Sequence, residues 1–159
     1  MNNYSHNNIT VNEQLYRYDG KVKLIDVYNK SKKHGGKFDM SEMFLDLESA
    51  YRTIYVDKND KVTCIDELKA KNIECKVRWN MVTEADVKII DDKTISLKKD
   101  GKEVILRAVA PSDAKAYIMS NAPKTSYDCE NKGTCRVGFA TKVTAGSKGT
   151  IKVELIPQK

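Results

Sequence analysis

The 159 residues are 40% hydrophobic, enough to bury one core, and this length suits a single domain. Lys and Arg number 28 against 22 Asp and Glu, which gives a net charge of +6. The lysines are scattered and lack the interleaved aromatics of a nucleic-acid groove, so we expect a solvated surface and no nucleic-acid partner. Binding of a polyanion is the alternative that this charge leaves open.

No apolar run approaches the roughly 18 residues of a membrane-spanning helix, so we expect no membrane span. The first residues, MNNYSHNN, are polar and no apolar run follows them, unlike a secretory signal peptide. The sequence therefore predicts either a cytosolic protein or one whose sequence begins inside a longer precursor.

The N-terminal part alternates between short extended segments and turns. Strands are predicted at Ile9–Val11 and at Lys21–Tyr28, where Val22 and Leu24 share one face. The following run Asn29–Lys37 is rich in Lys and Gly, so we expect a loop there.

One short helix and two further strands are predicted next. Ser41–Ala50 places apolar residues at helical spacing after a serine that suits an N-cap. Strands are expected at Arg52–Val56 and Val62–Asp66 around an acidic turn, and Leu68–Glu74 reads as a polar connection.

The central stretch Lys76–Arg107 holds three extended segments with period-two alternation, and Val104–Val109 adds a fourth. Asp100-Gly101 favours the positive φ angles of a tight hairpin. We interpret the stretch as an antiparallel meander with Trp79, the only tryptophan, in its core.

The C-terminal part continues the same pattern. Ala116–Met119 is a short predicted strand, and 120–134 is a long loop. Val137–Val143 and Ile151–Leu155 both alternate and are separated by AGSKG, which predicts a closing hairpin. About ten short strands with turns between them indicate an all-β fold, an antiparallel two-layer β-sandwich spanning residues 1–159 as a single domain.

The four cysteines fall as two local pairs, Cys64 with Cys75 and Cys129 with Cys135. Neither spacing matches a zinc knuckle or ribbon. Paired cysteines would suit an exported protein and reduced thiols the cytosol, so all four are disulfide candidates and the choice stays open.

Few residues are candidates for chemistry. No phosphate-binding glycine loop, nucleophile elbow or HExxH pattern occurs in the sequence. His34 lies in the polar run KKHGG, where a solvated histidine is expected. His6 stands just before a strand and has no second histidine near it in sequence, so by itself it is a terminal histidine without a partner.

The order of several motifs resembles a known family. SHNNITVNEQ resembles the histidine-containing H-N-T motif in the β-sheet domain of heparinase II/III-like polysaccharide lyases. AYRTIYVDKNDKVTCIDEL, VRWNMVTEADVKIIDDKTISLKKDGKEVILRA and RVGFATKVTAGSKGTIKVELIP are similar, in the same order, to later parts of that domain. The resemblance covers nearly the whole chain and points to a C-terminal β-sandwich region.

This resemblance implies an exported, periplasmic or extracellular bacterial enzyme that cleaves uronic-acid polysaccharides by β-elimination. In such enzymes an N-terminal α/α toroid carries the catalytic tyrosine, and some members hold a divalent metal such as zinc on the β-sheet region. His6 matches the metal-binding histidine of the H-N-T motif, although Asn8 replaces the motif's Thr. The other ligands, the toroid and its tyrosine have no counterpart in these residues, so His6 would be part of a site completed outside this chain.

Arg52 is a candidate clamp for a substrate carboxylate, with a structural strand arginine paired to an acid as the alternative. Four tyrosines are candidates for sugar stacking or base chemistry, with half-buried strand positions as the alternative. They are Tyr16, Tyr18, Tyr51 and Tyr55.

We therefore expect a non-catalytic β-sandwich of a polysaccharide lyase that supports the toroid and lines the acidic-glycan cleft, with no catalytic residue and no cofactor of its own. A free-standing carbohydrate-binding module is the second hypothesis, because exposed aromatics and positive charge would suit acidic glycans. A structural or interaction domain is the third.

Overall fold

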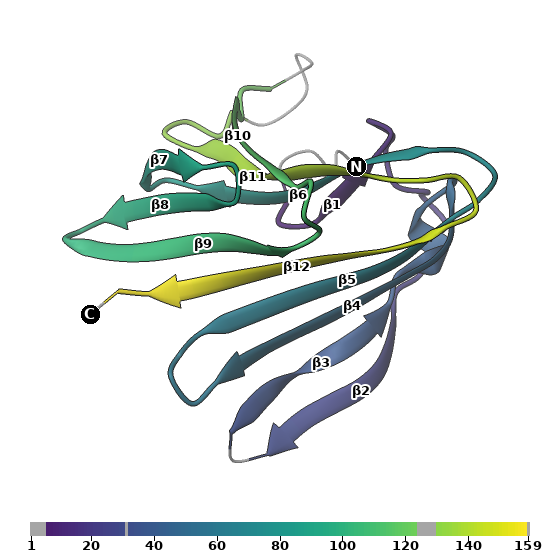
Figure 1. Cartoon of the computed structure of the whole chain (residues 1–159), viewed down its shortest axis with the longest axis horizontal. Helices are drawn as coiled ribbons and strands as arrows, with labels where there is room; N and C mark the ends of the chain where they lie inside the picture. Colours follow the sequence, from purple (N-terminus) through teal and green to yellow (C-terminus); the bar gives the residue numbers. More distant parts are fainter. Residues whose placement is uncertain (1–5, 31, 124–129, 159) are drawn as a thin grey trace.

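Alternating side chains form strands that pair into two antiparallel sheets (Figure 1). The computed structural model describes residues 6–30, 32–123 and 130–158. The described strands are, in chain order, β1 (Ile9–Val11), β2 (Lys23–Lys30), β3 (Lys33–Asp39), β4 (Leu47–Asp57), β5 (Val62–Ala70), β6 (Cys75–Thr83), β7 (Asp86–Asp91), β8 (Thr94–Lys99), β9 (Lys102–Ala110), β10 (Lys115–Ser120), β11 (Cys135–Val143) and β12 (Lys148–Pro157).

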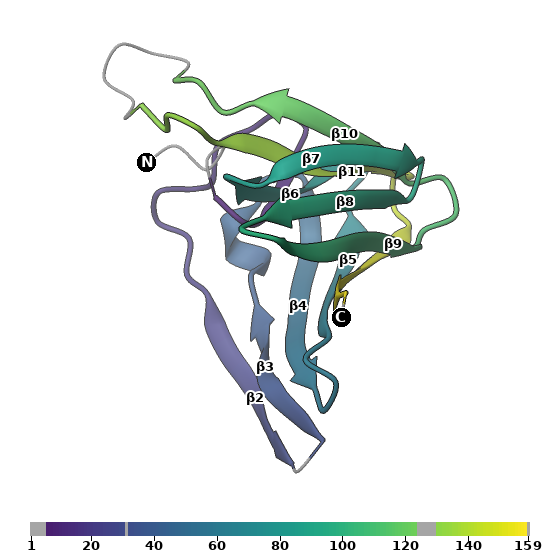
Figure 2. The ribbon, with the colours of Figure 1, turned by 90° about the vertical axis from the view of Figure 1, so that its left-hand side faces the viewer.

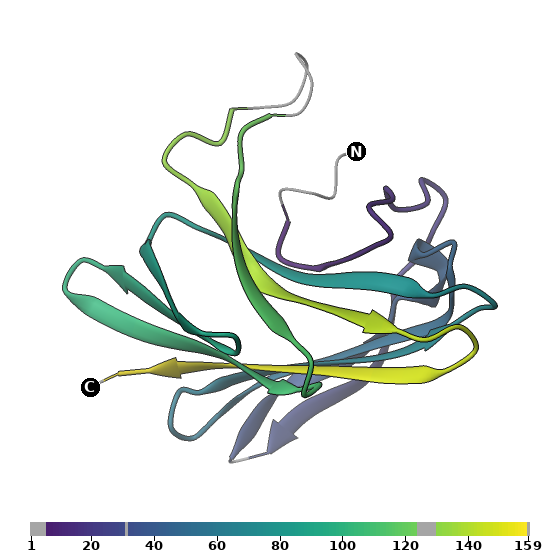
Figure 3. The ribbon, with the colours of Figure 1, turned by 45° about the horizontal axis from the view of Figure 1, so that its top comes forward.

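The smaller sheet has four strands in the order β1-β6-β11-β10, and the larger has eight in the order β2-β3-β4-β5-β12-β9-β8-β7. Figure 3 shows the smaller sheet lying over one face of the larger one. The predicted antiparallel two-layer β-sandwich is therefore confirmed. Its assignment to a single domain over residues 1–159 stays a prediction. No helix in the described ranges is long and apolar enough to cross a membrane.

Apolar side chains from both sheets fill the space between them. Trp79 on β6 is 6% exposed, so its predicted core position is confirmed. Phe139 on β11 is directly opposite Trp79 in the register of the smaller sheet. The apolar side chains that are at most 1% exposed include Ile9, Val77, Leu106, Val137, Phe139, Ile151 and Val153.

The β2–β3 hairpin extends beyond this core (Figure 2). Almost all of β2 is exposed, and its apolar side chains Leu24, Ile25 and Val27 are each more than half exposed. The smaller sheet does not cover this hairpin, so its order depends on contacts within the sheet.

The tryptophan strand does not belong to the meander, and that part of the sequence interpretation was wrong. Strands β7, β8 and β9 form the meander in the larger sheet, whereas β6 pairs with β1 and β11 in the smaller one. The short connection after β6 turns where the Ala85 N–H donates to Thr83 Oγ1 at 3.0 Å. Alternation shows that a segment is a strand, but it does not show which strand is its neighbour.

The predicted C-terminal hairpin was also wrong, although both of its strands exist. Strand β11 pairs with β6 and β10 in the smaller sheet, and β12 pairs with β5 and β9 in the larger sheet. The connecting turn contains Gly146 at φ 69, whose N–H donates to the Lys71 carbonyl at 2.7 Å. This turn carries the chain from one layer to the other.

Two local expectations near the hairpin were overturned. The expected loop Asn29–Lys37 contributes most of strand β3, and the expected helix is a single 3-10 turn, η1 (Ser41–Met43), followed by β4. Gly35 explains the first error: a Cβ there would lie 2.0 Å from the Ile54 carbonyl oxygen, so glycine permits close strand contact. Where the helix was expected, the Ser41 hydroxyl accepts a hydrogen bond from the Ala50 N–H at 3.0 Å and so joins the 3-10 turn to β4.

Phe139→Ala tests the shared core. Phe139 is fully buried between the sheets, so we expect the substitution to lower the free energy of unfolding by about 3–5 kcal/mol. Urea denaturation followed by tryptophan fluorescence measures the change. Ile118→Ala on β10 is the control, because Ile118 is 45% exposed. Its cost should stay below about 1 kcal/mol, and equal costs for both variants would contradict this packing.

Candidate functional site

The candidate site is built around residues 6–12, which contain β1. Side chains from both sheets bind carbonyl groups of this segment. Arg52 on β4 donates to the Asn7 carbonyl at 3.2 Å. Asn80 on β6 donates to the Asn8 carbonyl from its backbone at 2.8 Å and from its side chain at 3.0 Å. The segment therefore has a fixed path.

Further hydrogen bonds, from Tyr16 and from Val82, also hold this segment in place. The Tyr16 hydroxyl donates to the Ile9 carbonyl at 2.9 Å, and the Tyr16 ring meets Phe44 edge-on at 5.3 Å between centroids. The Val82 N–H donates to the Asn7 side-chain oxygen at 2.8 Å. These bonds give the polar residues around His6 a structural role.

A buried ion pair lies beneath the segment. Arg52 donates from Nε and a terminal nitrogen to the two Asp66 carboxylate oxygens at 2.7 and 2.9 Å. The Asp66 side chain is fully buried and that of Arg52 is 13% exposed. Burial alone lowers the pKa of Arg52, but the charge and hydrogen bonds of Asp66 outweigh it, so that pKa lies above its ordinary value.

A second polar cluster fixes the segment from the smaller sheet. The Asn80 amide donates to Thr10 Oγ1 at 2.8 Å, and the Tyr117 hydroxyl donates to Asn80 Oδ1. Burial raises the pKa of Tyr117 well above its ordinary value, so this hydroxyl keeps its proton. It acts here as a hydrogen-bond donor.

An open groove of about 1180 Å³ borders the segment. The fully exposed Tyr18 ring and the exposed His6 lie on it. Its only ion pair within the described ranges joins Arg17 and Asp19 at 2.9 Å. The remaining lining is mainly apolar and polar uncharged, which suits a sugar ring better than a small ion. The lining residues are His6, Asn8, Leu15, Tyr16, Arg17, Tyr18, Asp19, Gly20, Met43 and Leu45.

The residues at the groove do not by themselves fit a metal ion. A zinc site requires about three or four ligands, and the described residues contain no group of three His, Cys, Asp or Glu side chains that could hold an ion. Asp19, the other groove candidate, already pairs with Arg17. The role of His6 as one ligand of a divalent metal therefore stays a prediction that requires ligands from outside this chain.

The structure shows the structural alternative for Arg52. Its guanidinium binds Asp66 and the Asn7 carbonyl, so its donors are directed into the protein. A clamp on a substrate carboxylate stays a prediction that these contacts do not favour. His34 on β3 is exposed, as expected for a solvated histidine.

The four candidate tyrosines differ in exposure. Tyr16, Tyr51 and Tyr55 are half-buried strand or groove residues, whereas Tyr18 is fully exposed. Tyr18 is therefore the candidate whose ring is free for stacking on a sugar.

The structure contains free thiols at Cys64, Cys75 and Cys135, and Cys129 lies outside the described residues. The proposed Cys64–Cys75 pair is not formed: Cys64 contacts Asp66 at 3.9 Å, whereas Cys75 contacts the Asp46 carbonyl at 3.6 Å. The two thiols lie on neighbours in sequence, β5 and β6, but these strands belong to different sheets. Closeness in sequence therefore did not bring these two thiols together.

Sequence reasoning missed Asp66, Asn80 and Tyr117 as the groups that organise the site. A signal existed for Asp66, because it shares the alternating face of Cys64 and Leu68, which is the buried face of β5. A carboxylate at such a position requires a cationic partner. Nothing in the local pattern identified Tyr117 as the partner of Asn80.

Comparison with known proteins shows similarity at the level of structure. No family model and no curated protein matches the sequence. The crystal structure of heparan sulfate lyase HepC from Pedobacter heparinus matches 98% of this chain with a TM-score of 0.79 and 9% identity. A heparinase III structure matches 96% with a TM-score of 0.73 and 15% identity, and the heparinase III BT4657 gene product matches 97% with 0.78 and 14%.

This chain spans only about a quarter of the length of those structures, 24% for HepC and 23% for heparinase III. The resemblance seen in the sequence motifs is thus confirmed by the fold. The chain has the fold of one region of these heparinase III structures.

The Arg52–Asp66 pair can be tested by neutralising one partner and then replacing both with apolar residues. Asp66→Asn leaves the buried guanidinium without its counter-charge, so we expect a loss of about 3–5 kcal/mol in unfolding free energy. Combining Arg52→Met with Asp66→Leu should recover much of that loss, since no buried charge remains. Lys23→Met, which breaks the exposed pair with Glu42, is the control and should cost less than about 1 kcal/mol. A small cost for Asp66→Asn would contradict the role assigned to the pair.

Cys64 reactivity gives a second test. Burial raises the pKa of Cys64 from its ordinary value of 9.0 to about 11. Since the thiolate is the reactive form, we expect Cys64 to resist iodoacetamide at pH 8 in the folded protein and to react after denaturation, as measured by peptide mass spectrometry. The folded state holds this proton more tightly than the unfolded state, so stability should fall as pH rises from 9.0 towards about 11. Rapid native labelling would contradict the buried position.

Proposed function

We propose that this chain is a β-sandwich region of a polysaccharide lyase of the heparinase II/III kind. In the proposal it has no catalytic activity alone, supports a catalytic α/α toroid and lines one side of a cleft for an acidic glycan. The observation that carries the proposal is the fold match over 98% of the chain to a heparan sulfate lyase structure of about four times its length. The TM-score of 0.79 supports the same arrangement of both sheets.

The chemistry of the groove supports a non-catalytic role. β-Elimination requires a base near the working pH and a group that counters the developing enolate charge. Among the described groove residues, the Tyr16 hydroxyl donates a hydrogen bond to the Ile9 carbonyl, and Arg17 is paired with Asp19. His6 and Tyr18 lie exposed on an open surface. A base and a carboxylate-neutralising group would therefore come from outside this chain.

The groove fits one wall of a glycan cleft. Tyr18 offers a free aromatic face, and the neighbouring Leu15 and Leu45 are each more than half exposed. Aromatic faces stack on the apolar face of a sugar ring, and the Arg17–Asp19 ion pair lies beside this platform. In the proposal this surface contacts the sugar, and the toroid carries out the β-elimination.

Two alternatives have observations in their favour. The exposed Tyr18 and the net charge of +6 favour a free-standing carbohydrate-binding module. The exposed apolar edge strand β2 favours a structural domain that pairs with another chain. The localisation that follows from the main proposal is periplasmic or extracellular, and a divalent metal near His6 would be completed by ligands of the rest of the protein.

Two measurements test the proposal. We expect no new double-bond absorbance when the purified chain is incubated with heparin, heparan sulfate or alginate, because in the proposal the catalytic base belongs to a toroid outside this chain. A heparinase assayed in parallel is the positive control. Product formation by the chain alone would refute the non-catalytic role.

The groove itself is tested by Tyr18→Ala. Loss of the stacking ring should weaken binding of a heparin hexasaccharide by about fivefold or more in calorimetry, since stacking contributes about 1 kcal/mol. Tyr18→Phe keeps the ring and should bind like the unaltered chain. Unchanged affinity for Tyr18→Ala would remove the groove from the proposal.

A further inference from the structure

A second surface lies at the free end of the β2–β3 hairpin. The Lys33 ammonium group stands 4.2 Å from the centroid of the Tyr28 ring and 3.9 Å from that of Tyr55. It thus lies between aromatic rings of β2 and β4, and its own strand, β3, runs between them. Each contact is a cation–π interaction, which fixes the ammonium group and limits the freedom of the lysine chain.

Gly35 makes this arrangement possible. In the sheet register it is opposite Tyr28 on one side and Tyr55 on the other. Its missing side chain leaves the position between the two rings open, and a Cβ there would lie 2.6 Å from the Tyr55 Cα. Lys33 is two residues earlier on the same strand, so its side chain shares the face of Gly35 and reaches into this opening.

The same face continues along β3 to Lys37. Its ammonium group stands 5.4 Å from the Tyr51 ring centroid and 2.8 Å from a Glu67 carboxylate oxygen. Lys37 is therefore neutralised by an acid, whereas no acid pairs with Lys33 in the part of the chain that the structure describes. The unbalanced cation lies towards the tip of the hairpin.

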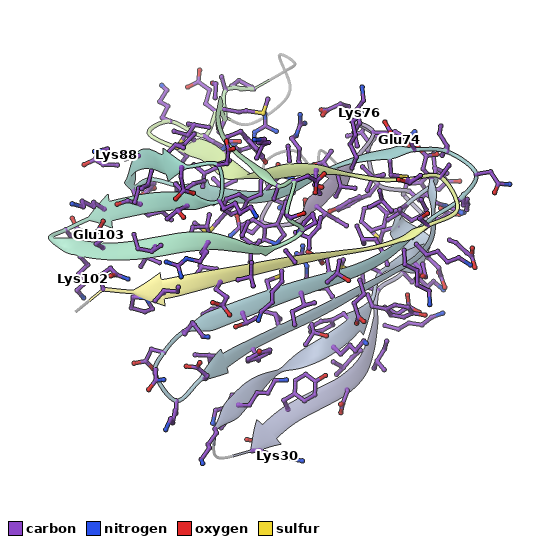
Figure 4. All side chains as sticks on the ribbon, viewed as in Figure 1. Lys30, Glu74, Lys76, Lys88, Lys102 and Glu103 are labelled. Atoms are coloured by element: carbon purple, nitrogen blue, oxygen red, sulfur yellow. The ribbon has the colours of Figure 1, made fainter. Side chains whose placement is uncertain are left out.

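Other lysines near the tip add to the positive charge of Lys33. Residues 28–34 and 55–61 carry five lysines against two aspartates, a net charge of +3 with His34 neutral. Asp57 already accepts from the Asn59 N–H at 2.8 Å and lies 3.8 Å from Lys61, which also contacts Glu154 at 3.3 Å. Lys30, Lys32 and Lys58 are exposed, and Figure 4 places Lys30 at the free end of β2.

We propose that Lys33, held between Tyr28 and Tyr55, forms with Lys30 and Lys32 an anchoring site for the sulfate or carboxylate groups of an acidic polysaccharide. This proposal rests on the proposed function and assigns it a second contact with the same glycan. An ammonium group that is already fixed binds an anion with a smaller entropy loss than a free lysine does. Charge-assisted hydrogen bonds to sulfate or carboxylate supply the attraction, and the tyrosine edges give the sugar an apolar contact.

The site is separate from the groove. Eight residues of β2 lie between them, and a strand rises about 3.3 Å per residue, so the tip is about 25 Å away. Figure 2 shows the hairpin leading away from the rest of the molecule. A glycan bound at both places would have to be several sugars long, so the tip would favour long chains over short ones.

The experiment measures binding of a heparin hexasaccharide by calorimetry at low ionic strength. Lys33→Gln should weaken binding about fivefold to tenfold, since a charge-assisted hydrogen bond is lost. Lys88→Gln removes the same charge from β7, at the opposite edge of the larger sheet, and should change affinity less than about twofold. Lys33→Arg should retain most of the affinity. Circular dichroism of each variant establishes that it is folded.

The outcomes separate this site from the groove. Weaker binding by Lys33→Gln and unchanged binding by Lys88→Gln would support the tip. Equal losses in both variants, or no loss in either, would overturn it, even where Tyr18→Ala still weakens binding and the groove stands. Loss in Lys33→Gln without loss in Tyr18→Ala would support the tip and reject the groove. Equally tight, Lys33-dependent binding of duplex DNA would overturn the assignment to a glycan.

Discussion

The buried pair of Arg52 and Asp66 is the interaction on which the candidate site depends. A fully buried carboxylate is stable only with a counter-charge and hydrogen bonds, and Arg52 provides both. The same guanidinium reaches the Asn7 carbonyl, so one side chain joins the core of the larger sheet to the segment that enters the smaller one. Together with the bonds from Asn80 and Val82, this connection fixes the backbone of the segment next to His6. A neutral pair could fill the same volume, but it would not provide a directed donor to the segment.

The groove and the tip of the β2–β3 hairpin are ordered by different kinds of interaction. The groove side is fixed by hydrogen bonds within a packed core, where Asn80, Thr10 and Tyr117 are all satisfied away from water. The hairpin has no second layer above it, so its side chains are ordered by their neighbours on the sheet. Contacts of the Lys33 ammonium group with the Tyr28 and Tyr55 rings help to order the side chains there. These cation–π contacts each contribute less than the burial of an apolar side chain in the packed core.

Much of the fold was predictable from alternation, because a strand with one buried face leaves a period-two pattern regardless of its partner. Ile9–Val11, the β7–β9 meander and the buried Trp79 were predicted in this way. Sheet membership was not, because the pairing of β6 with β11 and of β12 with β5 and β9 joins residues far apart in sequence. The two glycines of β3 looked like a loop signal, and Gly35 instead permits close strand contact. The partners within the site, such as Asn80 and Tyr117, come together only after those long-range pairings form.

The fold match and the site chemistry constrain each other. A likeness at 9–15% identity establishes the arrangement of strands, and function depends on particular side chains. The described side chains include an exposed ring at Tyr18 and, at Lys33, an ammonium group held against two tyrosine rings. His6 is exposed on a segment whose next two carbonyls are bound from both sheets, so its backbone position is fixed while its side chain faces solvent. The strand arrangement thus determines where this imidazole is attached, and the side chains that surround it determine what it can bind.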